Sequence, residues 1–327
     1  MASDGELNIL CAANETYVMP LAVMLTSVVC NLKEDCAANI YILESDIKEP
    51  LRQKIEASIR MNRKAGHRLS FHWLRVDIAR FKLYFKADHL QYMAPDCYSR
   101  LLAAEILPAS CDQVIYLDCD VVVLADLANL AAVDGRFPVA AVSGVWCPYV
   151  SSEIRGRSMV FNYQELGISP SNRYFQSGVL VMNLKLWRER GITRQLLEYL
   201  AKHWQHVVLH DQGVLNAVLH DQWFRLDQRW NQTTTVLYPE QWCAPAYSRE
   251  EWLKTRDDPF IVHYDGPDKP WNPGFHRPRA DFFRRYLKKT LFAEDCKAAL
   301  AHRVERILGF KNYFRLWRLR RALASNR

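Results

Sequence analysis

The chain lacks a hydrophobic run long enough to cross a bilayer. Its longest apolar stretch, Tyr17 to Cys30, is about 14 residues and contains Pro20, whereas a membrane-spanning helix needs about 20. The residues before that stretch include acidic Asp4 and Glu6, and the basic start of a signal peptide is missing. We therefore expect neither a transmembrane anchor nor a secretory leader.

Cysteine motifs are also missing, although the chain has nine cysteines. No two of them form a C-x-x-C pair, and most lie among apolar residues, as Cys11, Cys30 and Cys119 do. An odd number of scattered cysteines argues against a disulfide framework and against a zinc site. We expect reduced thiols and a cytoplasmic location. The sequence shows no internal repeat and no low-complexity linker.

The net charge of +7 is unevenly distributed. Residues 276–327 carry 15 basic and 4 acidic residues, whereas residues 1–275 carry 28 basic and 32 acidic ones. We place the one domain boundary between these two segments. In the tail, Phe310, Phe314 and Trp317 fall at helical spacing among basic residues, which is typical of a helix lying on an anionic membrane.

Two other interpretations of the tail remain open. A basic helix can simply be solvated while it packs on the body of its own protein. Nucleic acid would also attract the charge, but the apolar stripe and the acidic body disfavour this partner.

Strands and helices alternate along the first part of the sequence. Apolar runs at 7–13, 40–43 and 69–74 predict strands, and the segments 17–31 and 49–61 predict helices between them. This alternation predicts βαβ units, a parallel sheet and a Rossmann-like α/β fold.

Later segments continue this pattern less regularly. We expect strands at 113–117, 138–142, 174–183 and 260–263, and helices at 98–107, 126–133, 184–204 with a break at Gly191, and 211–219. Residues 76–96 look like an excursion over the sheet edge, and the irregular segment 143–170 is a lid candidate. Residues 223–260 hold four tryptophans among amide side chains, which suit either a sugar acceptor or a core.

Two carboxylates directly follow a predicted interior strand. Val114 to Leu117 is apolar, and Asp118 and Asp120 come next. Because ligands bind at the carboxyl ends of strands in such folds, this pair can hold a hard cation such as Mn²⁺ or Mg²⁺ that bridges a diphosphate. An isolated pair with this spacing is more often a capping or solvated group, and the motif around His263 is what changes the balance.

Another apolar strand ends in a possible ligand near residue 263. His263 can be a third metal ligand, and Lys269, six residues later, can meet a phosphate. Gly266 lies between these two residues and Pro270 directly follows Lys269, and both are typical of turns. The alternative for His263 is a histidine that only fills the core.

Taken together, these motifs resemble glycosyltransferase family 8. The resemblance rests on four segments in order: Leu117–Asp120, Phe175–Trp187, His210–Asn216 and His263–Trp271. It spans about residues 7 to 275 and includes a resemblance to bacterial lipopolysaccharide and lipooligosaccharide α-galactosyl- and α-glucosyltransferases. It implies a GT-A catalytic domain that retains anomeric configuration and uses a UDP-sugar.

The resemblance also implies residue roles. Asp118, Asp120 and His263 would hold Mn²⁺ or, alternatively, Mg²⁺. Asp211 would bind sugar hydroxyls, and Gln212 would lie near the anomeric carbon. The remaining implied donor-binding residues are Ala12, Ala13, Asn14, Tyr17, Arg100, Cys119, Gln176, Ser177, Gly266 and Lys269. Arg100 could otherwise be a solvated arginine on a helix.

Three positions depart from the family pattern. Asn14 stands where relatives often carry Asp, Gln176 replaces a usual Asn, and Ser143-Gly144 lies where some relatives place a sugar-binding Asp. The donor sugar therefore stays open between glucose and galactose. A Gln amide is a poor nucleophile compared with a carboxylate, so we favour front-face attack in which the leaving phosphate oxygen accepts the acceptor's proton.

The expected function is a hexosyltransferase that acts on a saccharide or glycolipid at the inner face of the cytoplasmic membrane. A metal-dependent phosphatase also places D-x-D after a strand, but near the start of its fold, whereas Asp118 lies well inside this chain. A non-catalytic sugar-nucleotide-binding protein is disfavoured because Asp120, His263 and Lys269 are also present.

Overall fold

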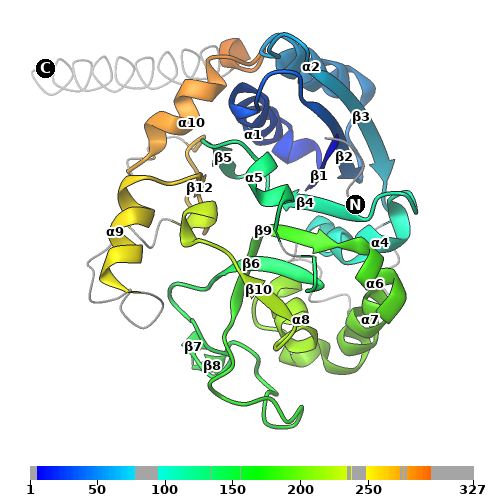
Figure 1. Ribbon diagram of the computed structural model, residues 1–327, viewed down its shortest axis with the longest axis vertical. Coiled ribbons are helices and arrows are strands. Elements are labelled where there is room, and N and C mark those ends of the chain that lie inside the picture. Colours follow the sequence, from blue (N-terminus) through cyan, green and yellow to red (C-terminus); the bar gives the residue numbers. More distant parts are fainter. Residues whose placement is uncertain are drawn as a thin grey trace, which may run out of the picture.

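The computed structural model describes residues 6–77, 95–133, 135–154, 156–233, 237, 248–272, 275 and 278–295. Most of the expected excursion at 76–96, Trp242 and the second half of the basic tail lie outside the described residues. The described part forms a seven-stranded sheet, a three-stranded sheet and a short two-stranded one, with helices packed around the largest (Figure 1).

The larger sheet has seven strands in the order β10-β6-β9-β4-β1-β2-β3. Their bounds are β1 Glu6–Ala13, β2 Ala37–Glu44, β3 Arg68–Arg75, β4 Gln113–Leu117, β6 Val139–Ser143, β9 Phe175–Asn183 and β10 Trp223–Arg225. β9 runs antiparallel to both β4 and β6, whereas the other pairings are parallel. The parallel pairing expected from the βαβ units of the first 75 residues is confirmed for β1, β2 and β3. The antiparallel direction of β9 was not foreseen, and it arises because the chain returns from β6 to β9 without a crossover helix.

Helices cover both faces of this sheet, which confirms the α/β class. One face packs against α1 Val18–Asn31, α2 Glu49–Arg60 and α5 Ala128–Ala131. The other packs against α4 Ala103–Ile106, α6 Leu184–Arg190, α7 Ile192–His203 and α8 His210–Val218. The predicted break at Gly191 is confirmed, since its φ of 60° ends α6 in the left-handed conformation.

The expected helix at 98–107 differs in form. Residues Pro95–Leu102 form a 3₁₀ helix, η3, and only the short α4 that follows is α-helical. Ser99 Oγ donates to Asp96 O at 2.5 Å, and Arg100 Nε donates to Cys97 O at 3.0 Å. Such side-chain bonds to carbonyls three residues earlier fit the tighter 3₁₀ turn.

A three-stranded sheet lies next to the larger one, at the end where β4 stops. It consists of β11 Gln232–Thr233, β12 Ile261–His263 and β5 Val121–Val123, flanked by the 3₁₀ helix η5 Gln228–Asn231 and by α9 Arg249–Asp257. β12 pairs antiparallel with β5, which places His263 opposite Val121. The turn after β4 therefore carries the chain from one sheet into the other.

The start of the basic tail packs on the body of the protein. α10 Ala280–Leu287 lies against α1 (Figure 1), and Asn31 Nδ2 donates to Tyr286 Oη at 2.8 Å. Phe283 is buried in the same contact. Among the predicted acceptor aromatics, Trp230 and Trp252 are buried as well, which favours the core interpretation for these two.

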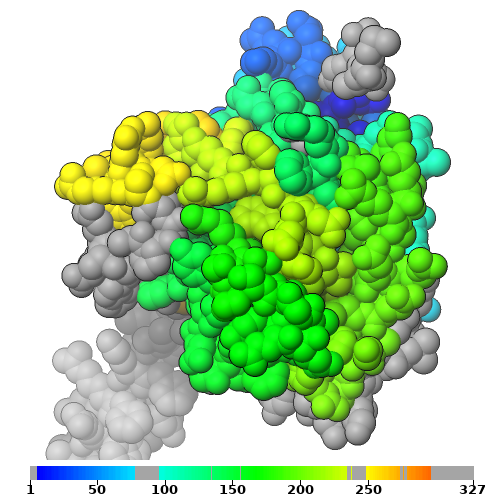
Figure 2. All heavy atoms as spheres, turned by 60° about the horizontal axis from the view of Figure 1, so that its bottom comes forward, coloured from blue at the N-terminus to red at the C-terminus, as the bar shows by residue number. Residues whose placement is uncertain are grey.

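The lid candidate, expected at 143–170, lies between the end of β6 at Ser143 and the start of β9 at Phe175, and we call this excursion the 144–174 segment. Its described residues include the two-residue strands β7 Glu153–Ile154 and β8 Arg157–Ser158, and it lies in the foreground of Figure 2 in green. None of the helices in the described part of the chain is long and apolar enough to span a membrane.

Candidate active site

A cavity of about 340 Å³ opens where the carboxyl ends of β1 and β4 meet the amino end of β9. Every predicted site residue except Lys269 lines it. The cavity is also lined by six residues that the sequence did not single out: Asp96, Cys97, Tyr116, Leu209, His210 and Asp265. The antiparallel direction of β9 is what brings Gln176 and Ser177 to this edge.

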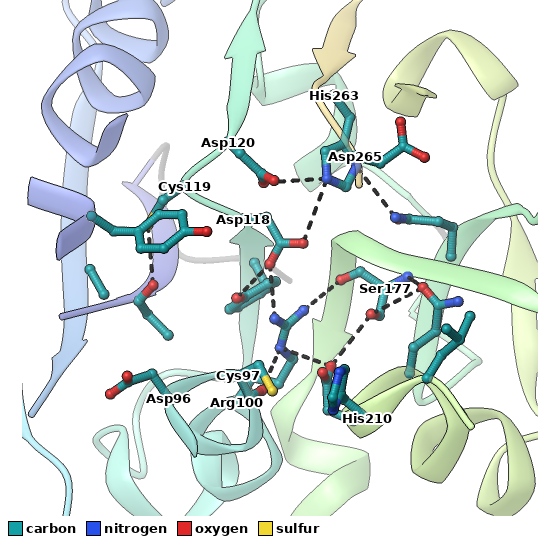
Figure 3. Close-up of a pocket in the computed structure, with 18 of the residues that line it drawn as sticks. Asp96, Cys97, Arg100, Asp118, Cys119, Asp120, Ser177, His210, His263 and Asp265 are labelled. Carbon is teal, nitrogen blue, oxygen red and sulfur yellow. Dashed lines mark hydrogen bonds and ion pairs between the residues drawn. The ribbon is translucent and has the colours of Figure 1, made fainter. Parts of the chain in front are cut away.

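The three predicted metal ligands converge. His263 Nε2 lies 3.3 Å from Asp120 Oδ1 and 3.9 Å from Asp118 Oδ2, and Figure 3 shows the two carboxylates facing the imidazole. All three ligand atoms lie within 4.8 Å of one another. Two carboxylates and one imidazole at this separation form a donor set that suits a divalent cation such as Mn²⁺.

Neighbouring amides fix the orientation of His263. Its Nδ1 lies 2.9 Å from Asn231 Oδ1, and the Asn231 amide in turn donates to Gln176 Oε1. When Nδ1 carries a proton and donates it to Asn231, Nε2 is free to bind a cation, which is the usual outer support of a metal-bound histidine. The residues present therefore fit a divalent cation.

The charges in this cluster shift the pKa values of its members. Burial would raise the pKa of Asp120, but His263 and Lys269 together bring it well below its usual range. Burial would lower the pKa of His263, yet the negative charges of Asp120 and Asp118 raise it above the ordinary value. The two carboxylates thus favour a positive charge at this place, which either a proton on His263 or a bound cation would supply.

Arg100 is buried beneath the cavity and is not solvated. Its Nη2 donates to Asp118 Oδ1 at 2.8 Å, its Nε lies 3.1 Å from Asp211 Oδ2, and its guanidinium stacks on the Tyr116 ring at 4.0 Å. Tyr116 Oη also donates to Asp118 Oδ1. Burial would lower the pKa of Arg100, but the two carboxylates raise it, so the arginine stays charged.

Asp211 and Gln212 lie in the first turn of α8. Ser177 N donates to Gln212 Oε1 at 3.0 Å, and Ser177 Oγ lies 3.4 Å from Asp211 Oδ2. Gln212 Nε2 donates to Tyr174 Oη. Burial raises the pKa of Asp211 despite the neighbouring Arg100. Both predicted catalytic side chains are thus held against β9 and border the cavity.

At the other end of the cavity, both polar atoms of the Asn14 side chain are hydrogen-bonded within the protein. Its Oδ1 caps the 3₁₀ helix η1, Glu15–Tyr17, by accepting from Thr16 N, and its Nδ2 donates to Asp96 Oδ2 at 2.8 Å. Tyr17 is half-buried and meets Trp271 edge to face at 5.9 Å. The carboxylate at this end of the cavity therefore belongs to Asp96.

Lys269 does not line the cavity but lies directly beside it. Its Nζ donates to Asp120 Oδ2 at 2.5 Å and to Tyr264 O at 2.8 Å. The ammonium group thus balances the charge of one of the expected metal ligands.

Gly178 matters because of the residues that pack against it, which the sequence alone does not show. A Cβ at this position would lie 2.4 Å from His263 Cε1 and 2.8 Å from Asp118 Oδ2. The missing side chain is what lets β9 pass close to the proposed metal ligands. Asp96 and Asn231 gave no motif signal, because each acts through a contact with a residue far away in sequence.

Comparisons with known proteins agree with this geometry. Residues 8–273 match the model of glycosyl transferase family 8. The chain is 27% identical to general stress protein A of Bacillus subtilis, covering 89% of this chain and 96% of that protein. It is 24% identical to a lipopolysaccharide 1,2-glucosyltransferase of Escherichia coli, with 88% and 80% covered.

Among solved structures, the galactosyltransferase LgtC in complex with donor and acceptor sugar analogues superimposes with a TM-score of 0.71 at 23% identity, covering 87% of this chain and 96% of LgtC. This likeness establishes the GT-A fold. Since the family match extends over most of the sequence, the chain belongs to glycosyl transferase family 8 and is a glycosyltransferase.

Proposed function

We propose that this glycosyltransferase moves glucose or galactose from a UDP-sugar to a saccharide or glycolipid acceptor, with retention of configuration and with Mn²⁺. The observation that carries the proposal is the convergence of Asp118, Asp120 and His263 Nε2 at the rim of the cavity. A cation bound by these three residues would neutralise the diphosphate as it leaves. Lys269, beside Asp120, is placed to add a second positive charge.

The contacts of Asp211 and Gln212 support a front-face reaction. A double displacement needs a free carboxylate or another nucleophile below the anomeric carbon. Asp211 is instead engaged by Arg100, and the Gln212 carbonyl accepts from Ser177 N. We infer that these side chains orient the donor sugar, while the leaving phosphate oxygen takes the proton of the attacking hydroxyl.

Asp96 is our candidate for recognition of the uracil base. A carboxylate accepts the N3–H of uracil but repels the unprotonated N3 of cytosine. Asp96 Oδ2 is supported by Asn14, so its second oxygen can read the base, and half-buried Tyr17 lines the same end of the cavity and can stack on it. The negative charge that relatives often carry at position 14 is thereby supplied from position 96.

The donor hexose stays open between glucose and galactose. At Gly144, where some relatives have a sugar-binding Asp, a Cβ would lie 2.7 Å from the carbonyl oxygen of Cys147. The backbone here leaves no room for a side chain, so hydroxyl recognition must come from other residues, among which Asp211 and Gln176 line the cavity.

The test is a panel of donors incubated with Mn²⁺ and a set of saccharide acceptors: UDP-glucose, UDP-galactose, their N-acetyl forms, GDP-sugars and a generic phosphate ester. We expect UDP release from one hexose donor, and we expect Asp120→Asn to abolish it while circular dichroism stays unchanged. Cleavage of the phosphate ester without UDP release would instead favour a phosphatase. If no donor is cleaved with any acceptor, the protein is a non-catalytic binder and the proposal is wrong.

We further propose that the basic tail holds the protein at the inner face of the cytoplasmic membrane. The support is compositional: residues 276–327 have an excess of basic over acidic side chains, with aromatic residues interleaved. This location would bring the cavity to a lipid-linked acceptor such as a growing lipopolysaccharide.

A further inference from the structure

A second cluster of metal-ligating side chains lies outside the active site. α7 ends at His203, and the short 3₁₀ helix η4, Trp204–His206, adds a second histidine. Glu165 comes from the 144–174 segment; its Oε1 lies 3.9 Å from His203 Nδ1, and its Oε2 lies 4.0 Å from His206 Nδ1. The two imidazoles are nearly parallel, with an interplanar angle of 28°.

These separations are too long for hydrogen bonds and close to what a shared cation requires. His206 Nδ1 is buried and has no hydrogen-bond partner among the described residues. One ligand atom from each of the three residues lies within 4.8 Å of the other two. A cation about 2.1 Å from each ligand in tetrahedral geometry puts the ligand atoms roughly 3.4 Å apart. Glu165 is more than half exposed, so its side chain can move inward and shorten its separations of 3.9 and 4.0 Å from the two histidines.

Asn162 is the neighbour that must accommodate a cation. Its Nδ2 lies 3.2 Å from His203 Nδ1, and its Oδ1 accepts from Tyr199 Oη at 2.8 Å. Because the amide is nearly symmetric in shape, a half-turn places Oδ1 toward the cation and lets Nδ2 donate to the Tyr199 oxygen. Asn162 would then supply an additional oxygen beside the two imidazoles and the carboxylate.

We propose that Glu165, His203 and His206 bind a divalent transition-metal cation of the Zn²⁺ type, separate from the active site. Two imidazoles with one carboxylate suit Zn²⁺, Co²⁺ or Ni²⁺, whereas Mg²⁺ and Ca²⁺ prefer all-oxygen sites. The cation would join the 144–174 segment to the end of α7.

The position of the cluster gives such a cation a structural consequence. The 144–174 segment already meets η4 elsewhere, since Arg157 Nη2 donates to Gln205 O at 2.8 Å and the Phe161 ring lies 5.3 Å from that of His206. Four residues after His206 the chain enters α8, whose first turn carries Asp211. The cation would therefore fasten the lid candidate to the segment that leads into the active site.

The experiment measures Zn²⁺ alone on the full-length, tag-free protein after chelator treatment. Asp120→Asn serves as the background, because it weakens the active-site donor set. We expect equilibrium dialysis to find one Zn²⁺ per chain in this background, and Co²⁺ to give the visible absorption of a tetrahedral complex. Adding Glu165→Gln should weaken binding by about ten-fold or more, and adding His206→Gln should abolish it.

His220→Gln is the matched control, since the partners of His220, Ala217 O at 3.0 Å and Asp221 Oδ2 at 3.5 Å, both lie outside this cluster. It should leave Zn²⁺ binding unchanged. Glu165 is a surface residue, so its variant keeps the test valid if His206→Gln folds poorly. Limited proteolysis gives a second readout: Zn²⁺ should protect the 144–174 segment in the background protein and not after Glu165→Gln. Zn²⁺ binding that neither Glu165→Gln nor His206→Gln weakens, or no binding at all, would overturn the proposal.

Discussion

The two oxygens of Asp118 have different tasks, and Arg100 separates them. Oδ1 accepts hydrogen bonds from Arg100 and Tyr116, while Oδ2 is directed toward His263. Arg100 also reaches Asp211, so one buried cation orients the proposed metal ligand and the proposed sugar ligand together. A lysine could not replace it, because only a guanidinium offers several donors in a fixed plane.

The proposal for Asp96 predicts a loss of base recognition. Asp96→Asn should raise KM for the UDP-sugar by about ten-fold or more, with little change in kcat, because it removes a charge-assisted hydrogen bond to the base. The double variant Asn14→Asp with Asp96→Asn should recover part of the affinity by returning a carboxylate to the pair. Steady-state kinetics and UDP-against-CDP competition measure both effects.

Asp112→Asn, at an exposed aspartate next to the other end of β4, is the control and should leave KM unchanged. If Asp96→Asn also leaves KM and the UDP preference unchanged, the base is read elsewhere.

At the scale of elements, α8 and β9 are locked together by one amide. Asn216 Oδ1 accepts from Phe175 N, and Asn216 Nδ2 donates to Phe175 O, each at 2.8 Å, and Asn216 is fully buried. Asp211 lies on α8 and Ser177 lies on β9. This pair of hydrogen bonds therefore fixes the position of Asp211 relative to Ser177 in the cavity.

Asn216→Ala should destabilise the protein by about 2–4 kcal/mol, because the backbone N–H and C=O of Phe175 lose their partner in a buried place. Activity should fall even where the variant is folded, since Asp211 and Ser177 lose their alignment. Urea denaturation gives the free energy of unfolding, and kcat at a temperature well below the transition gives the second effect. Gln228→Ala, which removes one buried bond to Ser143 O, is the comparison and should cost less. Equal losses would argue against a special role for the amide of Asn216.

The whole molecule should show a pH dependence that originates at His263. Its pKa in the folded, metal-free protein is raised by Asp120 and Asp118 against the effect of burial. The stabilisation from its proton is complete below the ordinary pKa of 6.5 and is lost as the pH rises through the raised value. Because a cation competes with this proton, Mn²⁺ affinity should rise over the same window.

The measurement compares the free energies of unfolding of wild type and His263→Asn in chelator at several pH values. The advantage of the wild type should shrink as the pH rises above about 6.5. A constant difference across this range would mean that His263 does not titrate there. Equilibrium dialysis with Mn²⁺ on the wild type checks the second expectation.

The membrane proposal concerns the end of the chain. Because α10 packs on α1 and Asp295 pairs with Lys54, truncation after Asp295 preserves these contacts. The shortened protein should keep its transferase activity toward a small water-soluble acceptor but lose binding to anionic vesicles. In the full-length chain, changing Arg318, Arg320 and Arg321 to alanine should weaken vesicle binding roughly a hundred-fold, at about 1 kcal/mol per basic residue. Sedimentation with neutral vesicles is the control, and equal binding by both forms would contradict the proposal.

Local sequence patterns were sufficient for much of the fold. The strands β1, β2 and β4 and the helix α2 lie where they were predicted, because period and burial are properties of short segments. The family motifs also named most of the residues that line the cavity. The secondary structure of these short segments and the residues of the family motifs could therefore be predicted from the sequence alone.

Only the tertiary structure decided which distant groups meet. The antiparallel direction of β9, the contact between Asn14 and Asp96, and the orientation of His263 by Asn231 each depend on residues separated by many positions in the chain. The same is true of Gly178, whose missing side chain matters only because His263 lies against it. The sequence by itself determined the elements and the candidate ligands, whereas packing decided their partners, because contact between remote segments is set by the whole fold and not by local periodicity.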